Sequence, residues 1–174
     1  YFFHAATREL SPYPIGGHDN QKYDIRSLLL DGDHLWIGTY AKGIRVVNLR
    51  TGAVKVYTHS RGIPYTICSN DVLCFYRGRN GEIYVGTSWG LCRYDAAKDN
   101  FMPIINIGSM ISITDMHEDM YNHLWIATSS SGVFTYNTIN GHYKNYQHER
   151  EDSTTITSNS VITLFEDVKG TMWF

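Results

Sequence analysis

The chain has 174 residues, of which 43% are hydrophobic and 18% are charged, and its formal net charge is −2. This composition excludes a disordered chain, and the absence of a Lys/Arg run argues against nucleic-acid or anionic-membrane binding. No apolar run is long enough to cross a bilayer, and the first ten residues lack the features of a secretion signal. A chain of this length forms one or at most two domains.

One short aromatic motif recurs along the chain: "LWIGT" at 35–39, "IYVGT" at 83–87 and "LWIAT" at 124–128, with a fourth copy beginning in "TMWF" at 171–174. The aromatic residue returns at intervals of roughly 40–50 residues, a period typical of propellers and solenoids. The sequence therefore predicts a repeat architecture.

Each copy of the motif is the second of four short strands. The first strands are "DIRSLLL", "DVLCFY", "ISITDM" and "VITLFE", and a turn rich in Asp, Asn and Gly separates each from the motif. Third strands follow ("IRVVNL", "LCRYDA", "VFTYNT"), and then outer strands ("VKVYTH", "FMPII", "YKNYQH"). The segment "YFFHAATRELSPYP" aligns with a third and fourth strand, with Ala6–Leu10 as the turn.

We therefore predict an all-β fold, a β-propeller fragment of four-stranded antiparallel blades with about four blades' worth of strands. The expected units are 1–22 (third and fourth strands of a split blade), 23–60, 61–107 and 108–149 (one blade each), and 150–174 (first and second strands of a further blade). All five belong to one propeller domain.

The repeated aromatic residues are expected to form the core. Both faces of a propeller blade pack against neighbouring blades, so an inner strand can be apolar at every position. The residues assigned to this structural repeat core are Trp36, Tyr84, Trp125 and Trp173.

The three cysteines, Cys68, Cys74 and Cys92, have no Cys-x-x-Cys spacing, so a zinc site or disulfide framework is not expected. Buried thiols are the favoured interpretation, and a single Cys74–Cys92 bridge between neighbouring strands is left open. The stretch "HEDMYNH" (117–123) places its histidines six residues apart, which does not match the zinc-protease motif. We predict no catalytic residue, no metal ligand and no cofactor in this chain.

Three and a half tandem copies, from about Tyr23 to Phe174, resemble the two-component regulator propeller repeat. The segments that carry the resemblance are "DIRSLLLDGDHLWIGTYAKGIRVVN", "SNDVLCFY" with "EIYVGT" and "GLCRYD", "SITDMHEDMYNHLWIATSSSGVFTYN" and "SNSVITLFEDVKGTMWF". The resemblance implies a periplasmic sensor region of a membrane-bound hybrid sensor kinase of gut Bacteroides-type bacteria. It also implies that the propeller detects an oligosaccharide or polysaccharide breakdown product, with the kinase and membrane segment outside this chain.

Propellers bind ligands at one end of their axis, on the loops that join outer to inner strands and second to third strands. Here these loops are 59–70, 106–109 and 148–159, together with 39–43, 87–90 and 128–132. Aromatic faces suit sugar rings, and Arg suits carboxylate or sulfate groups. The candidate ligand-binding residues are Trp89, Tyr40, Lys42, Arg61, Tyr65 and Arg150.

Trp89 is the leading candidate because Ala41–Lys42 and Ser131 stand at its place in the other copies. The alternative for Trp89 and Tyr65 is that they fill gaps between blades, and for Arg150 that it is a solvated charge. Two other function classes stay open, namely a protein-interaction scaffold and, with less support, a propeller lyase or glycan hydrolase. We also expect the chain either to pair its own ends or to self-associate with a second copy through split blades, because open blade edges and faces favour association.

Overall fold

The computed structural model describes residues 1–13, 15, 22–104 and 110–174. Every regular element in this part of the chain is a β-strand, so the predicted all-β propeller fragment is confirmed. The described residues include no helix that is long and apolar enough to cross a membrane.

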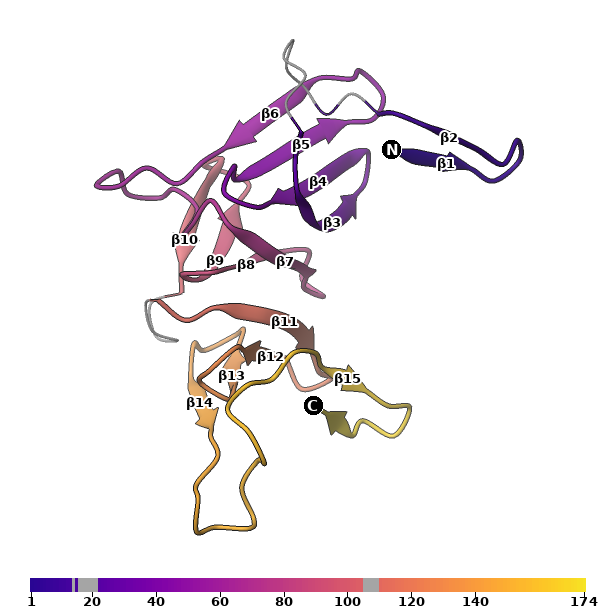
Figure 1. Cartoon of the computed structure of the whole chain (residues 1–174). Helices are drawn as coiled ribbons and strands as arrows, with labels where there is room; N and C mark the ends of the chain where they lie inside the picture. Colours follow the sequence, from indigo (N-terminus) through magenta and orange to yellow (C-terminus); the bar gives the residue numbers. More distant parts are fainter. Residues whose placement is uncertain (14, 16–21, 105–109) are drawn as a thin grey trace.

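Three four-stranded antiparallel sheets form the body of the molecule, and each is one blade (Figure 1). Blade 1 consists of β3 (Ile25–Asp31), β4 (His34–Thr39), β5 (Ile44–Asn48) and β6 (Val54–Tyr57). Blade 2 consists of β7 (Val72–Arg77), β8 (Ile83–Thr87), β9 (Gly90–Asp95) and β10 (Asn100–Pro103). Blade 3 consists of β11 (Ile113–Glu118), β12 (His123–Thr128), β13 (Val133–Asn137) and β14 (Tyr143–Tyr146).

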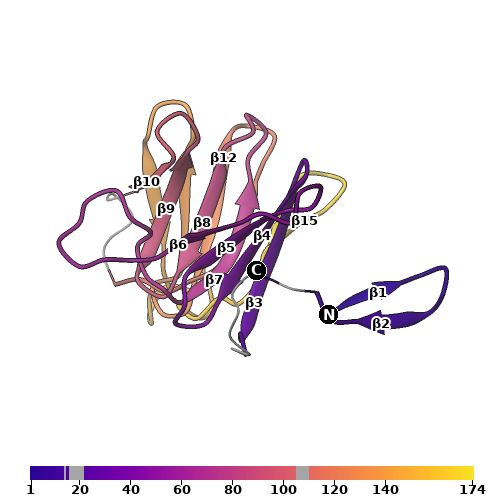
Figure 2. The ribbon, with the colours of Figure 1, turned by 90° about the horizontal axis from the view of Figure 1, so that it is seen from above.

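Two-stranded sheets stand at the two ends of the array (Figure 1). The first pairs β1 (Phe2–His4) with β2 (Glu9–Ser11), and the second pairs β15 (Phe165–Glu166) with β16 (Met172–Trp173). The β1–β2 turn covers residues 5–8, so the expectation of a turn over Ala6–Leu10 is wrong at its far end, where Glu9 and Leu10 are already paired. Figure 2 shows the blades standing side by side.

The first strand of each blade lies next to the first strand of its neighbour, and β7 touches both β3 and β11. Each first strand carries a register shift after its first residue, at Ile25/Ser27, Val72/Cys74 and Ile113/Asp115. A bulge of this kind bends a strand and increases its twist. Its recurrence gives the three blades the same internal geometry.

The hydrophobic core lies between the blades. One cluster joins blades 1 and 2 around Trp36, a second joins blades 2 and 3 around Tyr84, and a third joins blade 3 to the segment before β15. A Cβ on Gly38 would lie 2.8 Å from Val72, and one on Gly86 would lie 2.8 Å from Ile113. The glycine of the repeated motif is therefore needed where the next blade approaches.

Burial of the four repeat aromatics follows the amount of sheet that covers them. Trp36 is 4% exposed and Tyr84 is 1% exposed, each beneath a complete blade. Trp125 is half-buried beneath the two-stranded sheet. Trp173 differs from the expectation of a core residue, since it is 59% exposed in β16 with no further sheet packed over it in the described chain.

The alternative of a Cys74–Cys92 disulfide is wrong, because the two thiols lie on opposite faces of blade 2. Cys74 Sγ is 3.6 Å from the carbonyl oxygen of Ile113 in blade 3. Cys92 belongs instead to the cluster that faces blade 1, where Cys68 packs against it. All three cysteines are free thiols, as the favoured interpretation predicted.

Candidate ligand-binding surface

The loops between second and third strands have one architecture in all three blades. The threonine that ends the repeated motif is fully buried, and its hydroxyl donates to the carbonyl oxygen of a glycine across the loop. The donor–acceptor distances are 2.7 Å for Thr39–Gly43, 2.8 Å for Thr87–Gly90 and 2.8 Å for Thr128–Gly132. A buried, satisfied hydroxyl at the base fixes the backbone from which the loop residues project.

The loops between blades repeat a second motif, a His–Asn pair that closes the loop. The backbone N–H of His59 donates to Asn70 Oδ1 at 2.7 Å, and the ring Nδ1 lies 2.8 Å from the carbonyl oxygen of Ile67. His148 makes the same two contacts, to Asn159 at 2.7 Å and to Ile156 at 2.8 Å. These two loops are therefore braced at their base, while their tips carry different residues. The third loop, 106–109, lies outside the described residues.

Hydrogen bonds tie the two kinds of loop together at one end of the blades. The N–H of Gly43 donates to the carbonyl oxygen of Asn70 at 2.8 Å, and the hydroxyls of Ser69 and Ser88 are 3.0 Å apart. The loop 59–70 thus touches the loop of blade 1 at Gly43 and the loop of blade 2 at Ser88. We call this end of the molecule, formed by loops 39–43, 59–70, 87–90, 128–132 and 148–159, the loop end.

The structure brings some of the predicted residues together and separates others. Tyr40, Lys42 and Trp89 project from neighbouring loops on either side of Ser69 and Asn70, and all three are exposed. Tyr65 lies at the rim, because its carbonyl oxygen accepts a 2.9 Å hydrogen bond from Phe101 on β10, the outermost strand of blade 2, and Arg61 is an exposed residue of the same loop.

Arg150 has the equivalent sequence position in the next inter-blade loop, two residues after its bracing histidine, as Arg61 is after His59. The two arginines therefore recur with the loop motif, while Trp89 does not recur. This regularity was visible in the sequence as "HSR" and "HER", each followed eleven residues after the histidine by asparagine.

Trp89 is the largest exposed side chain among the candidates, at 59% exposure. Its loop has two residues between Thr87 and Gly90, where the loops of blades 1 and 3 have three. The N–H of Trp89 donates to Thr87 Oγ1 at 3.1 Å, which holds its backbone to the base of the loop. The alternative that Trp89 fills a gap between blades does not fit this exposure.

Cations accompany the aromatic rings of blade 1. The Arg26 guanidinium lies 5.1 Å from the centroid of the exposed Tyr40 ring, and Lys42 Nζ lies 5.2 Å from that of Tyr23. Burial raises the pKa of the Asp71 carboxyl, and the nearby charge of Arg26 acts in the opposite direction. Arg26 also lies 3.5 Å from the Asp24 carboxylate, so the loop end combines exposed aromatic faces with an Arg–Asp pair and with Lys42.

The opposite end of the blades, formed by the turns between first and second strands, is occupied by charges that pair with one another. A hollow of about 320 Å³ there is lined by residues that include Asp31, Glu82 and Arg93. Arg93 Nη1 is 2.6 Å from Glu82 Oε1, and Arg77 Nε is 2.9 Å from Asp31 Oδ1. The Arg93–Glu82 pair joins two parts of blade 2, and the Arg77–Asp31 pair joins blade 2 to blade 1. We therefore interpret the charged residues around this hollow as stabilising the fold and not as a ligand site.

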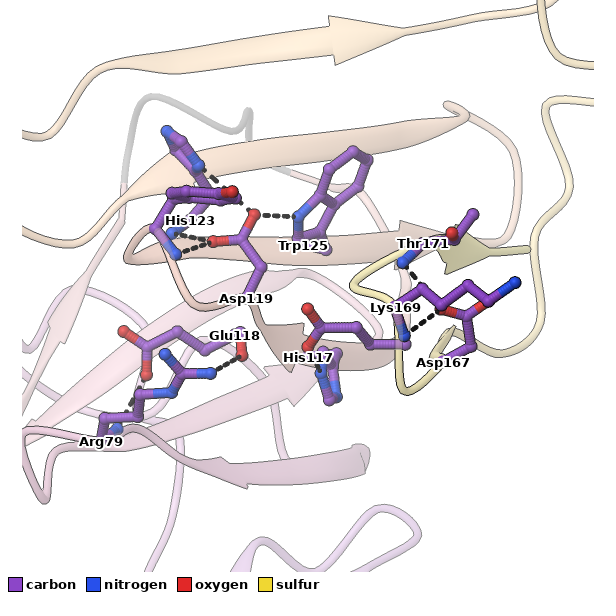
Figure 3. A network of polar contacts seen from close by, with 11 residues as sticks. Arg79, His117, Glu118, Asp119, His123, Trp125, Asp167, Lys169 and Thr171 are labelled. Carbon is purple, nitrogen blue, oxygen red and sulfur yellow. Dashed lines mark hydrogen bonds and ion pairs between the residues drawn. The ribbon is translucent and has the colours of Figure 1, made fainter.

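Figure 3 shows a network of the same kind in blade 3, at its junctions with blade 2 and with β15–β16. Glu118 and Asp119 are both buried in this network, at 2% and 8% exposure. Glu118 Oε2 accepts the N–H of Arg79 in blade 2 at 2.7 Å. His117 Nε2 is 2.8 Å from Glu166 Oε2, whereas His123 Nδ1 is 3.3 Å from Asp119 Oδ2. The two histidines of "HEDMYNH" thus have different partners.

Comparisons with known proteins agree with the repeat seen in sequence and structure. Residues 66–89 match the model of the two-component regulator propeller, so the resemblance is confirmed. No curated protein matches the chain.

Several solved structures share the fold. One extracellular domain of a hybrid two-component system from B. thetaiotaomicron is 23% identical with a TM-score of 0.75, and the match covers 98% of this chain and 22% of that one. A second such domain is 20% identical with a TM-score of 0.62, covering 91% and 27%. Virginiamycin B lyase from Staphylococcus aureus is 14% identical with a TM-score of 0.64, covering 89% and 50%. The chain thus spans about a quarter of the length of the two extracellular domains.

Proposed function

We propose that this chain is a segment of the extracytoplasmic sensor propeller of a hybrid two-component system, and that its loop end binds an oligosaccharide or polysaccharide breakdown product. The kinase that responds lies outside this segment. The family match at 66–89 and the B. thetaiotaomicron structures support the first part of the proposal. In this account the chain is a binding module and carries no catalytic activity of its own.

The observation that carries the second part is the state of Trp89. A 59% exposed indole on a loop fixed from below by Thr87 presents a rigid aromatic face to solvent. Stacking on a sugar ring uses such a face, and a preorganised loop loses little conformational entropy when the ligand binds. Tyr40 and Lys42 on the adjacent loop would contact the same ligand, with Lys42 near an acidic substituent.

Isothermal titration calorimetry against neutral, carboxylated and sulfated oligosaccharides tests the proposal. We expect binding by the unmodified chain and at least tenfold weaker binding by Trp89→Ala, with an unchanged melting temperature. Tyr121→Ala is the matched control, because Tyr121 is an exposed aromatic residue in the turn between β11 and β12, at the opposite end of the blades. Equal affinities of Trp89→Ala and the unmodified chain for every bound sugar would contradict the assignment of the loop end.

A further inference from the structure

The residue before the first strand has the same backbone role in all three blades. Its carbonyl oxygen accepts the N–H of the residue that follows the second strand, so it lies at the loop end. The three bonds are Tyr40–Asp24 at 2.8 Å, Ser88–Asp71 at 3.0 Å and Ser129–Ser112 at 3.1 Å. Asp24, Asp71 and Ser112 therefore occupy equivalent positions, and the side chain at this position can be compared between blades.

The carboxylate of Asp71 lacks the partner that its counterpart in blade 1 has. Asp24 forms an ion pair with Arg26 at 3.5 Å, and Arg26 is the residue at the register shift of β3. In blade 2 the register shift of β7 falls on Leu73, so this strand offers no cation at that place. Asp71 is half-buried, and its Oδ1 is shielded from solvent without a hydrogen-bond partner in the part of the chain that the structure describes.

Asp115 in β11 shows the contrast with a carboxylate that serves the fold. It is half-buried like Asp71, but its Oδ1 accepts the N–H of Met116 at 2.8 Å. Its Oδ2 accepts the N–H of Leu164 and the hydroxyl of Thr163, both at 2.8 Å, which ties blade 3 to the segment before β15. Covered polar atoms in proteins are almost always paired, so the unpaired oxygen of Asp71 requires another explanation.

Asp71 lies at the base of the loop that carries Trp89. Its carbonyl oxygen accepts the N–H of Ser88, the residue before Trp89, at 3.0 Å, and its own N–H donates to Ser69 Oγ at 3.2 Å. The hydroxyls of Ser69 and Ser88 are 3.0 Å apart. The backbone of Asp71 is therefore held on both sides, and its position relative to the Trp89 loop is fixed.

Blade 2 thus departs from the repeat at two adjacent places. Trp89 has no counterpart in the loops of blades 1 and 3, and Asp71 is the carboxylate whose oxygen is left without a partner. A residue that serves the shared architecture recurs with it, whereas these two features occur in one blade and on one side of Ser88. Their proximity indicates a common role at the loop end.

We propose, resting on the proposed function of the loop end, that Asp71 determines specificity at the same site: its carboxylate accepts hydrogen bonds from two adjacent hydroxyl groups of the sugar unit that stacks on Trp89. The side chain is half-buried and not enclosed, and the terminal torsion of Asp is broad, so the carboxylate can turn toward that unit without a backbone change. Hydroxyl–carboxylate hydrogen bonds are short and about twice as strong as those between neutral groups.

This arrangement selects the chemical class of the unit on Trp89. A neutral sugar with free adjacent hydroxyls supplies the donors that Asp71 lacks, whereas a sugar without them leaves the carboxylate unpaired. A uronic acid unit would bring a second negative charge next to Asp71, and like charges in contact oppose binding. An acidic substituent near Lys42 would belong to another unit of the oligosaccharide.

Isothermal titration calorimetry with matched probes tests the proposal. The probes are galactotriose with tri-galacturonic acid, and mannotriose with tri-mannuronic acid, together with cellotriose and xylotriose as further neutral sugars. We expect a neutral trisaccharide to bind, and to bind at least tenfold more tightly than its uronic acid partner. Asp71→Ser, which gives blade 2 the residue that blade 3 has at Ser112, should weaken binding of that trisaccharide at least tenfold. Asp115→Ser is the matched control and should keep the affinity.

Melting temperatures measured without sugar give a second readout. Asp71→Ser should melt at or above the temperature of the unmodified chain, because the unpaired oxygen makes no bond that the fold would lose. Asp115→Ser should melt at a lower temperature, because three hydrogen bonds lose their acceptor. A decrease for Asp71→Ser as large as that for Asp115→Ser would show that the carboxylate holds the fold, and would overturn the proposal.

The calorimetric outcomes separate this inference from the proposed function. Binding of the uronic acids that Trp89→Ala weakens and Asp71→Ser leaves unchanged would overturn the role of Asp71, while the loop end would remain the ligand site. Equal loss of affinity in Asp71→Ser and Asp115→Ser would also overturn that role. Failure of every probe, neutral and acidic, to bind would contradict both proposals.

Discussion

The indole N–H of Trp125 donates to Asp119 Oδ2 at 2.8 Å (Figure 3), and the same bond joins Trp173 to Asp167 at 3.0 Å. In both turns the other carboxylate oxygen accepts two backbone N–H groups, at 2.8 and 3.0 Å. One Asp thus orders a turn and orients the tryptophan six residues later. Blade 2 has Gly78 at this place, and there Tyr84 donates instead to Glu82 at 2.9 Å. Turn and aromatic residue therefore change together.

The Asp119–Trp125 bond predicts a stability loss on substitution. Asp119→Ala would leave a half-buried indole N–H and two turn N–H groups without their acceptor, at a cost of about 1–3 kcal/mol in the free energy of unfolding. Urea unfolding of Asp119→Ala and Asp167→Ala measures it. The loss should be smaller for Asp167→Ala, because Trp173 is exposed and water replaces the lost bond. Equal losses of unfolding free energy in both variants would contradict the prediction that burial of the Asp–Trp hydrogen bond increases its contribution.

The four repeat aromatics should contribute differently to the free energy of unfolding, because the neighbouring sheet covers each ring to a different extent. Trp36→Ala removes a ring that is packed between two blades and should cost about 3–5 kcal/mol. Trp125→Ala should cost less, and Trp173→Ala should stay within about 1 kcal/mol, as exposed substitutions usually do. Denaturant titrations of the three variants test this order. A destabilisation by Trp173→Ala as large as that by Trp36→Ala would mean that β16 is packed against a further sheet.

The lowered pKa of Asp99 predicts that part of the free energy of unfolding depends on pH in the acid range. The Lys55 ammonium and the Tyr57 hydroxyl bind the charged form and lower the pKa of Asp99 to about 2. Because the folded pKa lies below the unfolded value of about 3.9, the contribution is fully present above about pH 4 and is lost as pH falls toward 2. The partial exposure of the pair keeps the effect small.

Chemical denaturation of the unmodified chain and of Asp99→Asn between neutral pH and acid measures this term. The two free energies of unfolding should converge as pH falls through the folded pKa of Asp99. A constant difference down to the lowest pH that the fold survives would refute the linkage.

The three thiols should react with different rates. Burial raises the pKa of Cys74 to about 12 and raises that of Cys92 also, whereas interaction with the Cys92 side chain lowers that of Cys68. The thiolate is the reactive form, so Cys68 should be labelled first by a disulfide reagent at mildly alkaline pH. Cys74 and Cys92 should react only after unfolding. Mass spectrometry of the labelled peptides checks the order, and early labelling of Cys92 would contradict its burial.

The fold could be predicted from the sequence because one strand–turn pattern recurs in every blade. Each of its four copies alone indicates the architecture only weakly, but all four indicate the same one. The exposure of Trp173 could not be predicted from that pattern, since burial in a propeller depends on the neighbouring blade and not on the residue. For the same reason the spacing of Cys74 and Cys92 did not reveal that they face different blades.

Part of the loop end was also visible in the sequence. The exposure of Tyr40 and Trp89 agrees with their position in the loops, but the placing of Tyr65 at the rim depends on the path of loop 59–70 over β10. The bracing residues Thr87, His59 and Asn70 do recur in the sequence. Their role depends on buried hydrogen bonds to backbone groups, which the pattern alone does not specify.

The most direct test of the proposed ligand site uses the four tryptophans as separate reporters. In fluorine NMR of the 5-fluorotryptophan-labelled chain, assigned by single Trp→Phe variants, Trp89 reports on the loop end and Trp36, Trp125 and Trp173 report on the blade interfaces. On titration with an oligosaccharide that binds in calorimetry, the Trp89 resonance should shift to saturation while the Trp36 resonance stays in place. A shift confined to Trp125 and Trp173, with Trp89 unmoved at saturation, would contradict the account.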